Sequence, residues 1–191
     1  IKVGHTGTLD PFATGLMIIV VGKECKNAMT YTKLDKVYQA TFMLGKISQT
    51  GDPEGEITDY YRDGEPAFVK PTTQQVQAVL QRFTGDVSQC PPIFSAIKIN
   101  GRRAYQLARD GKAVEIPERT VTIHSLELID YDYPALKIRA HVSSGTYIRS
   151  LAVDIGSALG TGAYCSQLRR TRIADWDVAD AQLLSDFGID S

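Results

Sequence analysis

The sequence has little cysteine, and what it has follows no pairing pattern. Cys25, Cys90 and Cys165 are odd in number and far apart, which excludes both a disulfide framework and a paired zinc-binding motif. Such usage is typical of a reducing compartment, so we expect a cytoplasmic protein.

The chain also lacks a long apolar run and an excess of either charge. None of its hydrophobic stretches approaches the roughly 20 residues that a membrane-spanning helix needs, and no signal peptide is visible. Lys and Arg number 21 against 22 Asp and Glu, giving a formal net charge of −1. This balance excludes a uniformly basic surface but allows a local basic patch. The 191 residues suffice for one substantial core.

Histidine is scarce as well, and several familiar catalytic motifs are missing. His5, His124 and His141 show no ligand spacing, so we expect no metal. The motif of a phosphate-binding loop is absent, because Gly22-Lys23 is followed by an acid where the motif requires Ser or Thr. No serine-elbow motif is present, which gives a hydrolase triad little support.

What the chain does have is one acid in a loop rich in small residues, close to its first residue. The loop runs Gly4-His5-Thr6-Gly7-Thr8-Leu9-Asp10-Pro11-Phe12-Ala13-Thr14-Gly15. Glycines allow backbone angles that a side chain forbids, and Pro11 biases Asp10 toward an extended conformation. The apolar run Leu16–Val21 then predicts a buried strand. An acid at the mouth of a core strand is well placed for chemistry; the alternative is a surface turn capped by Asp10.

Arg149 is the expected charged partner of Asp10. It follows Ser143-Ser144-Gly145-Thr146-Tyr147-Ile148, where a strand end runs into a helix. Its planar guanidinium suits a carboxylate and would hold Asp10 ionised and oriented. The alternative is a solvated arginine on a helix surface.

Two tyrosines near these loops, Tyr38 and Tyr147, are candidates for stacking on a nucleobase. The alternative for each is a half-buried ring with a solvated hydroxyl. His5 is either an RNA or substrate contact or a loop residue whose ring bonds a carbonyl. Two basic runs suit a phosphate backbone, although a solvated face is the usual alternative; they comprise Lys98, Arg102, Arg103, Arg109 and Lys112, and Arg169, Arg170 and Arg172.

The remaining pattern predicts strands and helices in an irregular order. Helices are expected over Lys23–Leu34, from Thr72 or Thr73 to Phe83, and over Tyr147–Leu159; strands over Lys36–Lys46, Glu56–Tyr61, Val121–Tyr131, Leu136–Val142 and Ala163–Ile173. In the strand from Lys36 we expect Val37, Ala40 or Thr41, and Met43 on the inner face. Because strands and helices do not alternate regularly, the fold class is α+β with a mixed, largely antiparallel sheet flanked by helices.

Four stretches, in order along nearly the whole chain, resemble the TruB family of tRNA pseudouridine synthases. They are the loop with Asp10; Lys36-x-Tyr38 with Leu44-Gly45 and Thr50-Gly51-Asp52; Pro91-Pro92-x-x-Ser95-Ala96-x-Lys98-x-x-Gly101-x-x-Ala104-Tyr105-x-x-Ala108-Arg109-x-Gly111; and Gly145-Thr146-Tyr147-Ile148-Arg149 with Gly160-x-Gly162-Ala163 and Leu168-Arg169-Arg170.

The resemblance implies an isomerase that converts the T-loop uridine at tRNA position 55 to pseudouridine. It implies that Asp10 is the nucleophile that attacks a flipped-out uridine through the sugar or the base. Arg149 would pair with Asp10, and Tyr38 would stack on the base and assist proton removal. His5, Tyr147 and Leu168 would contact the target nucleotide. The expected partner is the T-arm of tRNA, bound by a monomer without cofactor or metal.

The resemblance also implies a domain organisation. Residues 1–191 would be a single catalytic domain, with an RNA-clasping thumb insertion at about 86–115. Relatives carry a segment before the Asp10 loop and often a small C-terminal RNA-binding domain, so we expect truncation at both ends. Two further classes remain open at this stage: an RNA-binding module without catalysis, and a metal-dependent aspartate enzyme that accepts phosphoryl groups.

Overall fold

A single sheet forms the centre of the molecule. The computed structural model describes residues 1–61, 69–95, 97–99, 102–104, 106 and 116–188. In spatial order the strands are β13 (Trp176–Asp177), β12 (Ala163–Ile173), β4 (Lys36–Leu44), β11 (Ala135–Val142), β10 (Arg119–Asp132) and β7 (Gly85–Gln89). All neighbours on this path are antiparallel, and β2 (Thr14–Gly15) adds a parallel pairing to β12. The sheet is therefore mixed and largely antiparallel, as predicted.

Three two-stranded ribbons and several helices complete the described fold. The ribbons pair β1 (Val3–His5) with β3 (Ile19–Val21), β5 (Lys46–Ser48) with β6 (Ile57–Asp59), and β8 (Lys98–Ile99) with β9 (Arg102–Arg103). The helices are η1 (Gly22–Asn27), α1 (Ala28–Thr32), α2 (Thr73–Arg82), α4 (Ile148–Ala158), η2 (Val178–Asp180) and η3 (Leu184–Phe187). Within the described ranges, no helix is long and apolar enough to cross a membrane.

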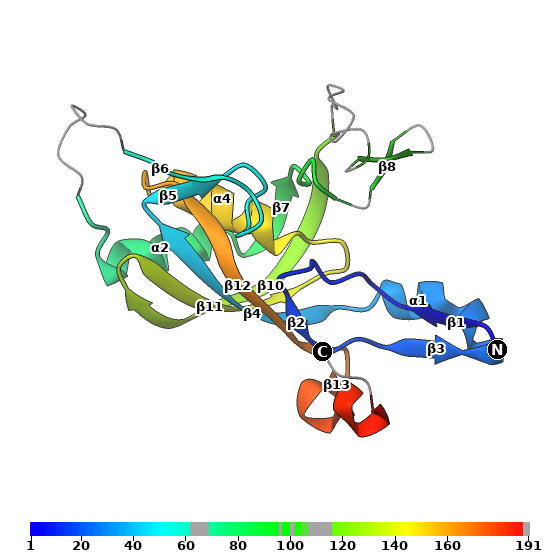
Figure 1. Cartoon of the computed structure of the whole chain (residues 1–191). Helices are drawn as coiled ribbons and strands as arrows, with labels where there is room; N and C mark the ends of the chain where they lie inside the picture. The colour runs from blue at the N-terminus through cyan, green and yellow to red at the C-terminus, as the bar shows by residue number, and fades with distance from the viewer. Residues whose placement is uncertain (62–68, 96, 100–101, 105, 107–115, 189–191) are drawn as a thin grey trace.

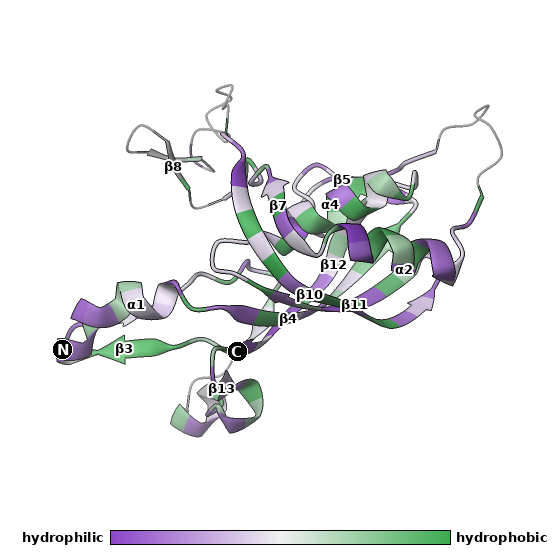
Figure 2. Cartoon of the chain, turned by 180° about the vertical axis from the view of Figure 1, so that it is seen from behind, coloured by the Kyte–Doolittle hydropathy of each residue, from purple (hydrophilic) through white to green (hydrophobic). Residues whose placement is uncertain are grey.

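Helices α2 and α4 cover one face of the sheet, so the fold class is α+β (Figures 1 and 2). Helix α2 begins where the sequence predicts, because Thr72 caps it. The Thr72 hydroxyl accepts a hydrogen bond from the backbone N–H of Gln75, and the Gln75 side-chain oxygen accepts one from the backbone N–H of Thr72. The core lies between these helices and the sheet, and includes Phe42, Ile138 and Leu151.

The inner face of β4 differs from the prediction by one residue. The buried side chains are Lys36, Tyr38, Ala40, Phe42 and Leu44, whereas Val37, Thr41 and Met43 point to the other face and are half-buried. A central strand carries apolar residues on both faces, and here the core face includes the polar ends of Lys36 and Tyr38. Alternation alone therefore selected the wrong face for Val37 and Met43.

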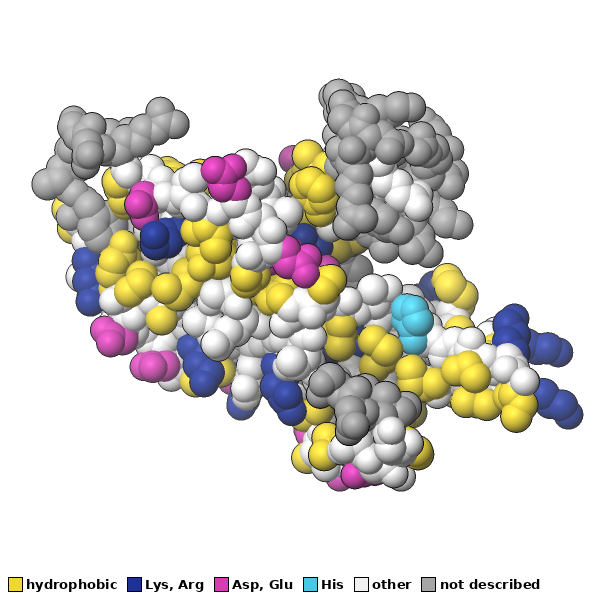
Figure 3. Space-filling model, in the orientation of Figure 1, with side chains coloured by type: hydrophobic (Ala, Val, Ile, Leu, Met, Phe, Trp, Pro, Cys, Tyr) yellow, Lys and Arg dark blue, Asp and Glu magenta, His cyan; other side chains and the backbone are white. Residues whose placement is uncertain are grey.

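The apolar run Leu16–Val21 is not a buried strand. Only Leu16 and Val20 are buried, while Ile19 and Val21 are about half-exposed on the β1–β3 ribbon. Hydrophobic side chains accordingly lie along the surface of this ribbon in Figure 3. The expected helix Lys23–Leu34 is also divided, into η1 and α1.

The Asp10 loop is fixed to the sheet by a buried arginine of β12. Arg170 is 1% exposed; its Nε donates to the Leu16 carbonyl oxygen at 2.7 Å and its Nη2 to the Gly7 carbonyl oxygen at 3.2 Å. The backbone N–H of Leu16 donates to the Arg170 carbonyl oxygen at 2.8 Å. Both ends of the loop are thereby held against one strand.

Gly15 is required where the loop meets β12. Its φ is +105°, and a Cβ there would lie 2.2 Å from the carbonyl oxygen of Arg170. Gly22 also has a positive φ, +61°, but a Cβ on it would meet no atom within 4 Å. A side chain at Gly15 would therefore meet both an unfavourable backbone angle and a close contact, whereas one at Gly22 would meet only the unfavourable angle.

We predict that Gly15→Ala lowers the free energy of unfolding by about 2 kcal/mol or more, because strain adds to the displacement of backbone atoms. Gly22→Ala, the matched control, should cost about 1 kcal/mol from its backbone angle alone. Urea unfolding of both variants measures the difference. Equal losses would contradict the tight contact between the loop and β12.

Candidate active site

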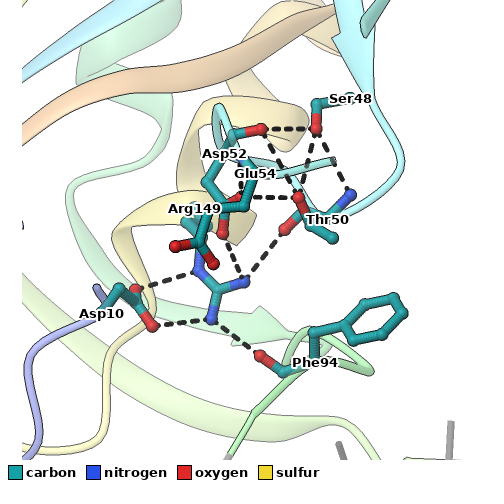
Figure 4. A network of polar contacts seen from close by, with 7 residues as sticks. All are labelled: Asp10, Ser48, Thr50, Asp52, Glu54, Phe94 and Arg149. Atoms are coloured by element: carbon teal, nitrogen blue, oxygen red, sulfur yellow. Dashed lines mark hydrogen bonds and ion pairs between the residues drawn. The ribbon is translucent and has the colours of Figure 1, made fainter. Parts of the chain in front are cut away.

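Arg149 holds Asp10 through both carboxylate oxygens. Its Nε donates to Asp10 Oδ2 at 3.0 Å and its Nη2 to Asp10 Oδ1 at 2.9 Å (Figure 4). Arg149 is the second residue of α4, and Asp10 lies in the loop between β1 and β2. Such a two-point contact fixes the orientation of the carboxylate as well as its charge.

The same guanidinium uses its remaining N–H groups on three other acceptors. Nη1 donates to Asp52 Oδ2 and to the Thr50 carbonyl oxygen, both at 3.0 Å, and Nη2 donates to the Phe94 carbonyl oxygen at 2.9 Å. With the two bonds to Asp10, all five donors of Arg149 are satisfied. Four segments distant in sequence thus meet at one side chain.

Burial divides the two carboxylates into an inner and an outer one. The side chains of Arg149 and Asp52 are 3% and 4% exposed, whereas Asp10 is 28% exposed. Asp52 is further held by the Thr50 hydroxyl and the Glu54 amide N–H, which both donate to its Oδ1. Asp10 is therefore the carboxylate of this cluster that a molecule from solvent can reach.

The pKa of Asp10 is raised above its usual 3.8, mainly because burial disfavours the charged carboxylate. The charge and hydrogen bonds of Arg149 act in the opposite direction, and the nearby charge of Asp52 adds a smaller upward effect. A carboxylate with a raised pKa holds its electron pairs less tightly, which favours nucleophilic attack.

Sequence reasoning missed Asp52 as a member of the site. Thr50-Gly51-Asp52 entered only as part of the resemblance to the family, with no role given to the acid, although Asp52 is almost fully buried. One signal was available: Asp10-Pro11 and Asp52-Pro53 are the two Asp-Pro steps in the sequence. Both acids face Arg149.

Tyr38 lies on β4 within electrostatic reach of Asp10. Burial raises the pKa of the Tyr38 hydroxyl, the neighbouring Arg170 opposes this through its charge and hydrogen bond, and the Asp10 charge raises the pKa further. Arg170 also acts on Lys36: burial, together with the Arg170 charge, lowers the pKa of Lys36 to about 8. Lys36 Nζ donates to the Thr32 carbonyl oxygen at 2.9 Å.

Leu168 and Tyr147 border the same face of the sheet. Leu168 pairs with Ala40 in the β12–β4 ladder, two residues along from the Arg170–Tyr38 pair. Tyr147 immediately precedes α4, and the Gln89 side chain grips its backbone N–H and carbonyl at 2.7 and 3.0 Å. His5 lies farther out, in β1 at the start of the Asp10 loop.

The positions of the expected phosphate contacts differ. Arg169 is exposed beside Thr14, as such a contact requires. The expectation for Arg170 is wrong, because its buried guanidinium is committed to the loop carbonyls. Lys98, Arg102 and Arg103 lie in the β8–β9 ribbon, where only the backbone is described, and Arg109 and Lys112 lie outside the described residues.

Two solved structures share the class of fold. The structure titled "Crystal Structure of a Cbf5-Nop10-Gar1 Complex" matches with a TM-score of 0.68 and 27% identity, over 93% of this chain and 42% of that one. "Structure of H/ACA RNP bound to a substrate RNA containing 2'-deoxyuridine" matches with a TM-score of 0.63 and 25% identity, over 93% and 40%. The fold is thus the α+β fold of pseudouridine synthases.

Family models narrow the assignment. Residues 1–148 match the TruB family pseudouridylate synthase N-terminal domain, and residues 149–188 match the tRNA pseudouridylate synthase B C-terminal domain. The chain therefore belongs to the TruB family. The boundary between the matches falls inside α4, and both matched regions contribute strands to the central sheet.

Curated relatives agree with the family. The tRNA pseudouridine synthase B of Francisella tularensis subsp. novicida is 45% identical over 180 residues, 94% of this chain and 58% of that protein. The protein of the same name from Parabacteroides distasonis is 47% identical over 175 residues, 92% of this chain and 72% of that protein. The chain thus spans somewhat more than half the length of the first relative.

The Arg149 cluster predicts a large loss of stability when Arg149 is replaced and a small one when Asp10 is replaced. Arg149→Met should lower the free energy of unfolding by about 3–5 kcal/mol, because Asp52 then stays buried without a cation. Asp10→Asn should cost about 1 kcal/mol or less, since Arg149 keeps Asp52 and both carbonyls and no charged carboxylate is desolvated. Urea denaturation at neutral pH compares them, and equal losses would refute the inner and outer assignment.

Proposed function

We propose that this chain is the catalytic domain of a tRNA pseudouridine synthase that isomerises the T-loop uridine at position 55. The observation that carries the proposal is the partly exposed Asp10 carboxylate, clamped by a buried Arg149 on an anchored loop. Family membership and the names of the relatives support the substrate class.

The reaction needs a nucleophile rather than a redox partner. The bond from uracil N1 to ribose C1′ breaks, a bond from C5 to C1′ forms, C5 loses its proton and N1 gains one. No electrons are gained or lost overall. In the proposed mechanism Asp10 attacks the nucleotide, at the sugar or at the base, and releases it after the uracil has turned.

The geometry of Asp10 suits this role. Each carboxylate oxygen accepts one hydrogen bond from Arg149 and keeps further acceptor capacity on the side away from the guanidinium. Arg149 thereby orients Asp10 without using all the acceptor positions of its carboxylate oxygens. Burial keeps the carboxylate from being overstabilised, as its raised pKa reflects.

The target base must leave its stack to reach Asp10, at a cost of a few kcal/mol. We assign Tyr38 to stacking on the extruded uracil and to proton removal, and Leu168 to an apolar contact with it. Tyr147 and His5 would hold the nucleotide or its loop. The Arg119 guanidinium lies over the Tyr147 ring, 4.8 Å from the ring centre.

The rest of the T-arm would lie on basic residues around this site. The candidates are Arg169 beside the Asp10 loop and Lys98, Arg102, Arg103, Arg109 and Lys112 in a thumb at about residues 86–115. The structure keeps the first residues of that range in the sheet, as β7, and the chain leaves the sheet after Gln89. We therefore take the thumb to begin at Cys90.

We predict that Asp10→Asn abolishes isomerisation, by about 10⁴-fold or more, because an amide is not a nucleophile. Binding to a T-arm stem-loop should change little, since no phosphate contact is lost. Tritium release from C5-labelled uridine measures the first quantity and a gel shift the second. Undiminished tritium release would remove the mechanism, whereas binding without release by the unmodified chain would favour a non-catalytic RNA-binding module.

We predict that Tyr38→Ala reduces the rate of tritium release more than Tyr38→Phe, provided that stacking is the main contribution of the ring. The phenylalanine variant keeps the flat ring and the packing against Ala40 and Phe42, so it also controls for damage to the core. Circular dichroism checks that both variants fold. Equal losses in two folded variants would assign the effect to the hydroxyl.

A further inference from the structure

Two of the three histidines in the sequence meet an aspartate on the sheet. His124 Nε2 lies 3.0 Å from Asp35 Oδ2, and the rings of His124 and His141 are 4.6 Å apart between centres. Each of the three residues offers one ligand atom, and these atoms all lie within 4.8 Å of one another. Spacing along the chain does not predict this cluster, because Asp35 is far from both histidines in sequence and the three residues lack ligand spacing.

Strand pairing and one β-bulge bring the three side chains together. Asp35 directly precedes β4, and His141 of β11 pairs with Val37 of β4. In β10 the register shifts between Ile123 and Ser125, so His124 is the extra residue opposite His141. A bulge redirects a side chain that regular alternation would place elsewhere.

The cluster is separate from the Asp10 site. Ala140 and Val142, the neighbours of His141, are fully buried in the core together with Tyr38, so His141 projects from the opposite face of the sheet. Helix α4, which carries Arg149, packs on the core face. Asp35, His124 and His141 thus belong to no part of the proposed mechanism.

We propose that Asp35, His124 and His141 form a binding site for a late first-row divalent cation such as Zn²⁺. Two imidazole nitrogens and one carboxylate oxygen are a donor set that zinc uses, with a fourth position left for water. Ligand atoms about 2.0–2.2 Å from one tetrahedral ion lie about 3.3–3.6 Å apart. The observed separations need only a small inward movement of the side chains.

The site is accessible to an ion, and its donor atoms already lie close together. The side chains of His124 and Asp35 are 37% and 45% exposed, so a hydrated cation can enter without unfolding the sheet. The Asp35–His124 pair keeps two of the ligands together. It does not account for the position of the His141 ring, which places a third donor at the same point.

A bound ion would join three adjacent strand segments of the sheet. Asp35 stands at the start of β4, whose core face carries Tyr38, and its carbonyl oxygen also accepts the backbone N–H of Ala174, just after β12. The cation would therefore act as a cross-strand staple at the end of the sheet nearest the Asp10 loop.

The test is titration of the metal-free chain, with any affinity tag removed, by ZnCl₂ in a calorimeter and by Co²⁺ in an absorption spectrometer. We expect one equivalent of Zn²⁺ to bind, a higher melting temperature with the ion, and a visible Co²⁺ spectrum of tetrahedral type. His141→Ala and His124→Ala should each weaken binding by more than the roughly 10- to 100-fold typical of losing a group that only orients a ligand.

His5→Ala is the matched control, since it removes the one histidine outside the cluster and should leave Zn²⁺ binding unchanged. All the readouts are independent of RNA and of catalysis, so their outcome does not depend on whether the proposed function is correct. The proposal is overturned if the folded chain shows no saturable binding, or if the folded double variant of His124 and His141 binds as the unmodified chain does. Either result would leave a close contact between His124 and Asp35 with a neighbouring ring.

Discussion

The arrangement of the site depends on one buried cation, the guanidinium of Arg149. It joins the Asp10 loop, the turn at Thr50 and Asp52, the segment at Phe94 and the first turn of α4. A charge buried at this depth is tolerated only when every donor is matched, and here all five are. The four segments therefore cannot shift independently: displacement of any one leaves a buried N–H or carboxylate without a partner.

A second buried arginine, Arg170, also holds the Asp10 loop, but through its backbone. Arg170 donates to backbone carbonyls of the loop, whereas Arg149 binds a side chain that the loop presents. The first interaction fixes the path of the backbone, and the second fixes the direction of one carboxylate. Because β12 supplies Arg170 and α4 supplies Arg149, packing of α4 on β12 sets the distance between loop and clamp.

The sequence predicted the fold class, most element bounds and the Asp10–Arg149 pair, because these depend on local patterns and on a specific motif. It failed where tertiary context decides. The core face of β4 could not be chosen from alternation, since Lys36 and Tyr38 have polar ends yet point inward. Arg170 looked like an RNA contact because Arg169-Arg170 reads as a surface run, although alternate residues of a strand face opposite sides. The meeting of His124 with His141 depends on a bulge that no residue type announces.

The presence of two carboxylates on Arg149 has a chemical consequence beyond holding the fold. A lone arginine facing Asp10 would lower the pKa of that acid. Asp52 offsets part of this effect, because its negative charge shares the cation and itself raises the pKa of Asp10. The cluster of one cation and two anions carries a formal charge of −1, and burial leaves Asp10 as its reachable member. Burial is the larger upward influence on the pKa of Asp10 and the charge of Asp52 a smaller one, so Arg149 positions the carboxylate while its pKa stays above the ordinary value.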